Sequence, residues 1–178
     1  MSDHLVFVIH KHKATSLHYD FRLEINGKMP SWAIAKGPTL DNTLKRLALP
    51  TTDHDIDYRH FEGVIPEGSY GAEPVMIWDE GYYIPEIEIS KGIRKEITDR
   101  KEGEKVMIEG MKKGEIKFVL HGKKLKGSFA MVKTKGWGPK DSWLLIKHND
   151  AFVKSGWDAN DYDFSAKSGK SIEEINRK

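Results

Sequence analysis

The chain of 178 residues contains no cysteine, which excludes a disulfide-stapled scaffold and a metal site built on thiolates. It also has no run of about eighteen apolar residues, so no segment is predicted to cross a membrane. The N-terminal stretch MSDHLVFVIHKHK lacks the long apolar run of a signal peptide. We therefore expect a soluble cytoplasmic protein with no membrane partner.

An excess of charge of one sign is also missing. The 29 Lys and Arg residues nearly balance the 27 Asp and Glu residues, and the formal net charge is +2. Any attraction to nucleic acid must therefore come from a local basic patch, because the field of the whole chain is weak. The length suits one hydrophobic core, and we expect a single domain over residues 1–178 and a monomer.

Strand patterns dominate the sequence. Short apolar runs such as LVFVIH, LHYDFRLEI, SWAIAK, EPVMIWD and SWLLIKH alternate with turn signals such as NGK and PEGSYG. A helical pattern appears only near the end, where Ser171 and Glu174 have the spacing of a capping box. These patterns predict a mainly β protein, an antiparallel barrel or sandwich with short helical elements and a short C-terminal helix.

A charge-dense segment between Ile84 and Met111 interrupts the strand pattern. It contains no aromatic residue and few signs of a face directed at a core. We interpret residues 86–110 as a mobile, charged surface insertion, and the alternative is a lid or a substrate clamp.

The stretch LHYDFRL, residues 17–23, places three polar side chains on one face of a strand, because alternate residues of a strand share a face. His18 and Asp20 can both reach one cation, and either His10 or His12 can supply a third ligand. Two imidazoles and one carboxylate form a mixed site suited to Mn²⁺, Fe²⁺ or Zn²⁺. The periodicity does not choose between His10 and His12, since both fall on the same face of their strand.

Arg22 lies on the same face and adds a guanidinium fork that can grip a phosphate or a carboxylate in two places. The alternative is a simple ion pair with Asp20. Lys36, Lys45 and Arg46 follow as further basic residues, each either a phosphate contact or a solvated surface charge.

The stretch TTDHDIDYRHFEG, residues 51–63, contains His54, Tyr58 and His60 among four acids. A histidine near a phosphoryl group can donate a proton, and a tyrosine hydroxyl can hydrogen-bond a phosphate oxygen. The alternative is a polar loop whose Asp residues cap turns. His121 and His148 end apolar runs and are interpreted as structural.

Several stretches together resemble one known family. FVIHKHKATSLHYDFRLEINGKMPSWAIAKGPTL, KRLAL, DHDIDYRHFEGVIPEGSYGA, VMIWDEG and IKFVLHGKKLKGSFAMVKTK occur in the order seen in the phosphoesterase domain of bacterial DNA ligase D and its stand-alone archaeal relatives. The resemblance implies a compact β-barrel with the active site in a groove on one side.

The resemblance also implies a manganese-dependent enzyme that heals 3′ ends in DNA break repair by non-homologous end joining, with Zn²⁺ or Co²⁺ as other possible metals. Such enzymes remove a 3′-terminal ribonucleoside to leave a 3′-phosphate, and then hydrolyse that phosphate to a 3′-hydroxyl. The implied substrates are DNA or RNA/DNA 3′ ends of a primer-template. A DNA ligase and a polymerase or primase are expected to act in trans.

The resemblance assigns roles position by position. The metal ligands it implies are His12, His18 and Asp20. The phosphate contacts it implies are Arg22, Lys36, Arg46, His54 and Tyr58, with His54 as a possible proton donor and Tyr58 as a hydrogen-bond donor. The sequence departs from the family where GAEPV replaces GAGTV, and its segment 86–110 is longer than usual.

Two other classes of protein fit parts of the sequence. An iron- and 2-oxoglutarate-dependent dioxygenase also uses His-x-Asp, but it needs a remote histidine followed by an arginine, and His121 fits poorly. A nucleic-acid-binding barrel without catalysis would use Trp32, Tyr58 and Trp78 for stacking. We interpret the tryptophans mostly as core residues.

Overall fold

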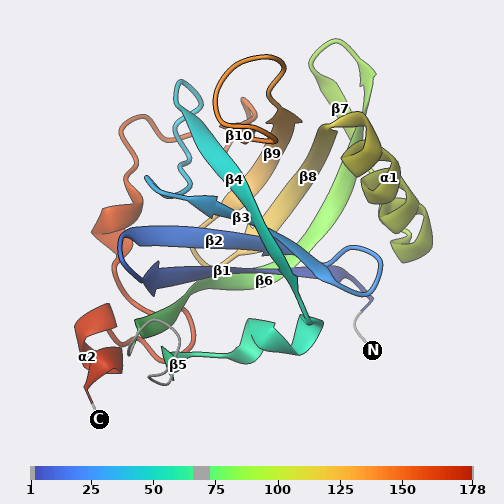
Figure 1. Cartoon of the computed structure of the whole chain (residues 1–178). Helices are drawn as coiled ribbons and strands as arrows, with labels where there is room; N and C mark the ends of the chain where they lie inside the picture. Colours follow the sequence, from blue (N-terminus) through green and yellow to red (C-terminus); the bar gives the residue numbers. More distant parts are fainter. Residues whose placement is uncertain (1–2, 66–72, 178) are drawn as a thin grey trace.

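The computed structural model describes residues 3–65 and 73–177, and Figure 1 shows a molecule built mainly of strands. The turn expected at PEGSYG, residues 66–71, lies outside the described residues. The elements in chain order are β1 (Leu5–Lys13), β2 (Leu17–Leu23), β3 (Met29–Ile34), β4 (Lys45–His54), the 3₁₀ helix η1 (Ile56–His60), β5 (Gly63–Ile65), β6 (Glu73–Ser90), β7 (Ile93–Glu96), α1 (Arg100–Lys113), β8 (Glu115–Gly122), β9 (Lys126–Lys133), β10 (Trp143–Lys147), the 3₁₀ helix η2 (Ala159–Tyr162) and α2 (Ile172–Asn176).

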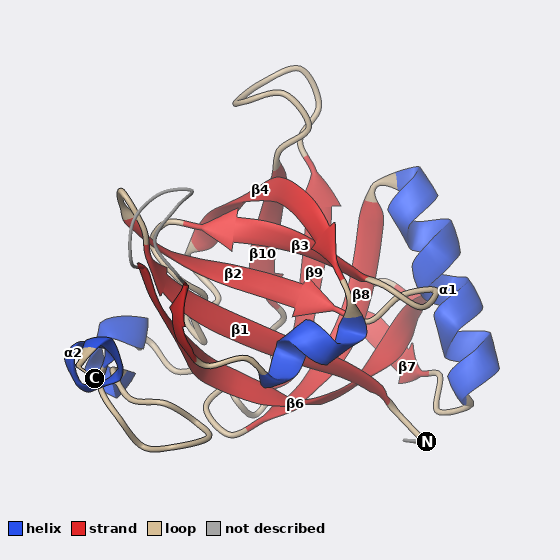
Figure 2. Ribbon diagram, turned by 60° about the horizontal axis from the view of Figure 1, so that its bottom comes forward, coloured by secondary structure: helices blue, strands red, loops and turns tan. Residues whose placement is uncertain are grey.

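Eight of the strands close into an antiparallel barrel. They pair in the order β1, β2, β3, β4, β10, β9, β8 and β6, and β6 pairs back with β1 (Figure 2). Closure removes the unpaired edges that an open sheet would expose. The prediction of an antiparallel barrel is confirmed, and the sandwich alternative is wrong.

The barrel interior is filled by large apolar side chains from seven of its eight strands, and β4 contributes only Ala48. Tyr19, Phe21 and Leu23 of β2 are buried, as the alternation of LHYDFRL predicts, whereas Leu17 is 41% exposed at the open start of the strand. The tryptophans expected in the core, Trp32 and Trp78, are 1% and 0% exposed. They therefore present no surface on which a base can stack.

A second, smaller apolar cluster lies on the outside of the barrel wall. Val8 of β1, Met29 of β3 and Ile77 of β6 are fully buried there, and Ile56 of η1 packs against them. This contact holds η1 against the outer face of the barrel, where it is drawn in Figure 2. The polar face of β1 and β2 is consequently covered on one side by the chain that follows β4.

The segment 86–110 contains regular structure that the sequence did not predict. β6 continues to Ser90 and pairs with β7, and α1 follows. Asp99 caps α1 by accepting a hydrogen bond from the backbone N–H of Glu102, and Gly114 ends it in the left-handed conformation with φ 84°. Met107 is fully buried and joins the main core. Helix α1 therefore lies where the sequence showed no helical pattern, and it is one of the short helical elements expected beside the C-terminal helix.

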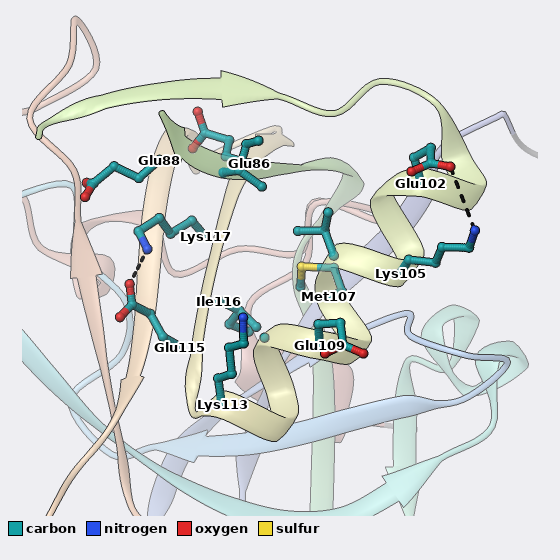
Figure 3. A pocket seen from close by; sticks show the side chains of 13 residues that line it. Glu86, Glu88, Glu102, Lys105, Met107, Glu109, Lys113, Glu115, Ile116 and Lys117 are labelled. Atoms are coloured by element: carbon teal, nitrogen blue, oxygen red, sulfur yellow. Dashed lines mark hydrogen bonds and ion pairs between the residues drawn. The ribbon is translucent and has the colours of Figure 1, made fainter. Parts of the chain in front are cut away.

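A pocket of about 520 Å³ lies between α1 and the strands β6 and β8 (Figure 3). Its lining includes five glutamates and three lysines. Dashed lines in Figure 3 join Lys105 to Glu102 and Lys117 to Glu115. With acids in excess and no histidine, this pocket has no chemistry suited to a phosphate.

The C-terminal helix is confirmed as α2. Ser171 accepts a hydrogen bond from the backbone N–H of Glu174, and the Glu174 carboxylate accepts one from the backbone N–H of Ser171. This is the reciprocal capping box that the spacing predicts. Within residues 3–65 and 73–177, no helix is both long and apolar enough to span a membrane.

Candidate metal and phosphate site

The hairpin of β1 and β2 brings five polar residues together on the outer face of the barrel. In the antiparallel register His12 faces His18, His10 faces Asp20 and Val8 faces Arg22. Residues opposite each other in neighbouring strands have their side chains in contact on one face. One ligand atom from each of His12, His18 and Asp20 lies within 4.8 Å of the others, and this is the only such group of three among the described residues.

Each of the two clustered histidines is held through the nitrogen that points away from the cluster. His12 Nε2 lies 2.7 Å from Glu73 Oε2, and His18 Nδ1 lies 3.2 Å from the backbone oxygen of Ser16. When these nitrogens donate, the other nitrogens keep a free lone pair. His12 Nδ1 lies 3.9 Å from Asp20 Oδ2, and His18 Nε2 lies 3.3 Å from it. Both lone pairs are directed at the space beside the carboxylate, which is how metal-binding imidazoles are oriented.

Glu73 is a residue of the candidate site that sequence reasoning missed. It is the first residue of β6, two residues before Val75, which pairs with His12 of β1, and it is buried. The only signal in the sequence was the departure GAEPV, in which a glutamate stands where the resembled family has glycine. Its contact with His12 depends on strand pairing and could not be read from the sequence.

His10 is the second histidine of β1, and both of its nitrogens are engaged. Nε2 donates to the backbone oxygen of Phe61 at 3.0 Å, and Nδ1 accepts from Arg22 Nε at 3.0 Å. Burial and the neighbouring Arg22 charge lower the pKa of His10 to about 3. A neutral imidazole with no free lone pair cannot bind a cation, so His10 acts as a support for Arg22.

Arg22 connects the cluster to the chain after β4. It is 3% exposed, and its Nη2 donates to Asp20 Oδ2 at 3.3 Å. Its Nη1 lies 3.1 Å from His54 Nδ1, and its guanidinium lies 5.2 Å from the centre of the Tyr58 ring. The ion pair with Asp20, which the sequence offered as an alternative to phosphate binding, is therefore present.

The charges around Asp20 decide the protonation of the cluster. Burial opposes ionisation of Asp20, but the hydrogen bond from His18 and the charge of Arg22 outweigh it and lower the pKa of Asp20. The hydrogen bond to Asp20 is also the main reason why the pKa of His18 is raised. In the absence of a metal, a proton on His18 neutralises the carboxylate that a cation would otherwise neutralise.

His54 and Tyr58 lie beside Arg22. His54 ends β4, and its Nδ1 is 2.9 Å from the backbone oxygen of Thr52 as well as 3.1 Å from Arg22 Nη1. Nδ1 can donate to Thr52 or accept from Arg22, but it cannot do both at once. Burial and the charge of Arg22 lower the pKa of His54, and burial raises the pKa of Tyr58. At neutral pH both side chains are therefore uncharged.

Lys36 and Arg46 lie around a neighbouring pocket of about 420 Å³ whose lining also includes His18. Arg46 comes from β4 and has a buried Nε without a hydrogen-bond partner among the described residues. Leu47 and Leu49 contribute apolar walls and are 39% and 37% exposed. Lys36 and Arg46 thus line the same pocket as His18, whereas His54 and Tyr58 lie in contact with Arg22.

His60 and His121 lie outside the cluster. His60 is exposed at the end of η1, and His121 of β8 stacks on Tyr82 with ring centres 4.4 Å apart. β8 pairs with β6 and β9 and not with β1 or β2. Because the third residue of the cluster is His12 of the adjacent strand, the arrangement with a remote histidine that a dioxygenase requires is absent from the described residues.

Fold and site together describe a small closed β-barrel domain that carries histidine and carboxylate donors on its outer face. The chain belongs to the family of the DNA ligase D 3′-phosphoesterase domain, whose family model matches residues 10–133.

Curated relatives agree with this assignment. The chain is 40% identical over 151 residues to the multifunctional non-homologous end joining protein LigD of Pseudomonas aeruginosa. The matched stretch covers 85% of this chain and 16% of the relative. It is 38% identical over 138 residues to the corresponding repair protein of Mycobacterium tuberculosis, covering 78% of this chain and 15% of the relative. It is 39% identical over 144 residues to LigD of Mycolicibacterium smegmatis, covering 81% of this chain and 17% of the relative. The chain thus spans about one sixth of the length of these proteins.

Proposed function

We propose that the protein is a manganese-dependent 3′-phosphoesterase that processes DNA ends during break repair. The observation that carries the proposal is the cluster of His12, His18 and Asp20 with the Arg22 guanidinium beside it, in a member of the 3′-phosphoesterase family. A divalent cation and a guanidinium side by side suit a phosphate, which has several anionic oxygens to share between them.

The donor chemistry of the cluster fits a divalent metal. His12 Nδ1, His18 Nε2 and Asp20 Oδ2 are two nitrogen donors and one oxygen donor, a set that suits Mn²⁺, Zn²⁺ or Co²⁺. Three protein ligands leave coordination positions for substrate and water. A bound metal supplies a Lewis acid for a phosphate oxygen and lowers the pKa of a coordinated water.

The other residues act on the phosphate and its leaving group. His10 and Asp20 hold the Arg22 guanidinium in place, so Nη1 can donate to a phosphate oxygen instead of His54 while the group keeps its position. His54 would then donate Nδ1–H to Thr52, and its neutral Nε2 would accept a hydrogen bond from substrate or water; Nε2 would act as a proton donor to a leaving oxygen only after taking up a proton. Tyr58 keeps its proton and can donate it in a hydrogen bond to a phosphate oxygen.

Lys36 and Arg46 are proposed as contacts to a phosphate at the His18 side of the cluster. The unpartnered Nε of Arg46 supports this role, because a buried donor without an acceptor favours an anionic ligand. The apolar walls beside them would accommodate the terminal nucleoside.

The proposed substrates are DNA or RNA/DNA 3′ ends. A 3′-terminal ribonucleoside would be removed to leave a 3′-phosphate, and the phosphate would then be hydrolysed to a 3′-hydroxyl. The names of the relatives connect them with non-homologous end joining, so a DNA ligase and a polymerase or primase are the proposed partners.

A labelled primer-template that carries a 3′-ribonucleotide or a 3′-phosphate tests the proposal. We expect the wild type to shorten or dephosphorylate the primer with Mn²⁺ and to leave it unchanged in EDTA. His18→Ala should abolish both reactions and weaken Mn²⁺ binding in calorimetry, whereas His60→Ala, an exposed histidine near the site, should behave as wild type. An inactive wild type with Mn²⁺ would refute the function, and an active His18→Ala would refute the site. Binding of the primer-template unchanged by EDTA, without any reaction, would instead favour a non-catalytic binding barrel.

A further inference from the structure

A second pocket, of about 770 Å³, lies where the chain between β10 and α2 packs on the turn between β8 and β9. Its lining includes five lysines and no aspartate or glutamate. The chain as a whole is nearly neutral, with a formal net charge of +2, so this is a local concentration of positive charge. The lysines are Lys123, Lys124, Lys126, Lys154 and Lys167.

Aromatic side chains line the same pocket. Phe152 and Phe164 are 46% and 45% exposed, and both rings lie in this one pocket among the lysines. Trp157 and Tyr162 stack on each other with ring centres 4.9 Å apart. We refer to the five lysines together with these four aromatic residues as the lysine–aromatic surface.

The lysines of this surface fall into two groups. Lys123 and Lys167 donate to the backbone oxygens of Ala166 and His60, and Lys124 donates to those of Trp78 and Phe164. Lys126 and Lys154 are exposed, and their side-chain ammonium groups form no hydrogen bond or ion pair within the described part of the chain. The first group fixes the surface, and the second group leaves two cations free for a ligand.

The lysine–aromatic surface is attached to the elements that carry the candidate site. Asp163, which lies between Tyr162 and Phe164, accepts from Lys11 Nζ at 2.7 Å, and Lys11 is the neighbour of His12 on β1. Ser168 Oγ donates to Glu62 at 2.6 Å, just beyond η1. Figure 1 shows η2, β5 and the start of α2 at the end of the barrel where β1 finishes. Site and surface therefore share one end of the barrel.

We infer that the lysine–aromatic surface binds single-stranded nucleic acid. Lysines pair with the phosphates, and exposed aromatic rings stack on bases of any sequence, which is the combination that single-strand-binding surfaces use. The inference rests on the proposed function for the identity of the strand, which would be the one whose 3′ end enters the site. The surface would hold the strand some nucleotides away from the reacting phosphate.

Fluorescence anisotropy with a labelled oligothymidylate of about twenty nucleotides, in EDTA and at several salt concentrations, tests the inference. We expect Lys126→Glu with Lys154→Glu to weaken binding about tenfold or more and to reduce the salt slope by about 1.4, since each lost phosphate contact removes about 0.7. Phe152→Ala with Phe164→Ala should weaken binding about tenfold with little change in slope. The matched control is Lys91→Glu with Lys101→Glu, two exposed lysines of the β6–β7 turn and α1, which should bind as wild type.

A second measurement separates this inference from the proposed function. Dephosphorylation of a 3′-phosphorylated dinucleotide, which is short, should be unchanged in all of these variants. Loss of oligonucleotide binding in the Lys126 and Lys154 variant would support the surface even if no phosphoesterase activity were found. Equal oligonucleotide affinity in this variant and in the control variant would overturn the inference. Stronger binding of an acidic peptide such as polyglutamate than of the oligonucleotide would also overturn it.

Discussion

Glu73 Oε2 accepts a hydrogen bond from His12 Nε2 at 2.7 Å, and this contact fixes the tautomer of His12. The proton sits on Nε2, so the lone pair of Nδ1 faces Asp20 Oδ2. A carboxylate behind an imidazole also increases the basicity of the nitrogen that binds a metal. The glutamate of GAEPV thereby replaces a glycine of the family pattern with a residue that orients a candidate ligand.

Removing this carboxylate should weaken metal binding. We expect Glu73→Ala to reduce Mn²⁺ affinity about tenfold or more, because His12 loses its fixed tautomer and orientation. Glu73→Gln should have a smaller effect, since the amide oxygen can still accept the hydrogen bond. Calorimetric titration of the metal-free protein measures both effects, and the control is Glu115→Gln, at an exposed position at the start of β8. An affinity unchanged in Glu73→Ala would show that the contact has no role in orienting His12.

Metal binding should weaken as the pH falls. The Asp20 hydrogen bond raises the pKa of His18 above the usual value of 6.5. Protons therefore begin to compete with the metal for His18 at a pH above 6.5, and they compete more strongly as the pH falls. In the metal-free protein this proton stabilises the fold fully below pH 6.5, and the stabilisation is lost as the pH rises through the raised pKa. Titrations with Mn²⁺ at pH 8, 7 and 6 should give steadily weaker binding and proton release. An affinity that does not change over this range would contradict the assignment of His18 as a ligand.

His10 should make the stability of the protein depend on pH in the opposite sense. Its pKa is lowered to about 3 in the folded protein, chiefly by burial, so the unfolded chain binds a proton that the folded chain does not. Above pH 6.5 this difference does not lower the free energy of unfolding. Below pH 6.5 the free energy of unfolding falls by about 1.4 kcal/mol per pH unit as the pH drops toward 3.

The variant His10→Gln isolates this effect. Its amide supplies the donor for the Phe61 oxygen and the acceptor for Arg22 but does not titrate. Urea unfolding at pH 7 and pH 5 should show a smaller loss of stability for this variant than for the wild type. His60→Gln, at an exposed position, should keep the wild-type difference, and an identical pH dependence in His10→Gln would refute a buried neutral His10.

Helix α1 should contribute to the stability of the barrel. Met107 is fully buried against the main core, and its replacement by alanine leaves a cavity. We expect Met107→Ala to reduce the free energy of unfolding by about 2–5 kcal/mol. Lys105→Ala on the exposed face of the same helix should change it by less than about 0.5 kcal/mol. If wild type and Met107→Ala had equal free energies of unfolding in urea, segment 86–110 would be a loosely attached insertion, as the sequence suggested.

The strands were predictable because their signal is local. Alternation in LHYDFRL identifies the buried face of β2, and the capping box at Ser171 identifies α2. Helix α1 was not predictable from its pattern, because it packs on the barrel through a narrow stripe around Met107 and is charged elsewhere. Its cap at Asp99 and its terminal Gly114 were local signals that the dense charge obscured.

The candidate site was predictable in part. The alternation of side chains along one strand predicts that His18, Asp20 and Arg22 share a face, and in β2 they do. The choice between His10 and His12 depends on Phe61 and Glu73, which are distant in the sequence. The grouping of Lys36 and Arg46 with His18, and of His54 and Tyr58 with Arg22, likewise required the paths of β3, β4 and η1 around the barrel.

The sequence by itself determined the strand-rich class, the polar face of β2 and the set of residue types able to hold a cation and a phosphate, because these depend on the alternation of side chains along a strand. The tertiary structure decided which nitrogen of each histidine is free, because that depends on the hydrogen-bond partner brought to the other nitrogen by a neighbouring strand. It also decided that His10 is buried and neutral and that Glu73 stands behind His12, since closure of the barrel through β1 and β6 creates both environments.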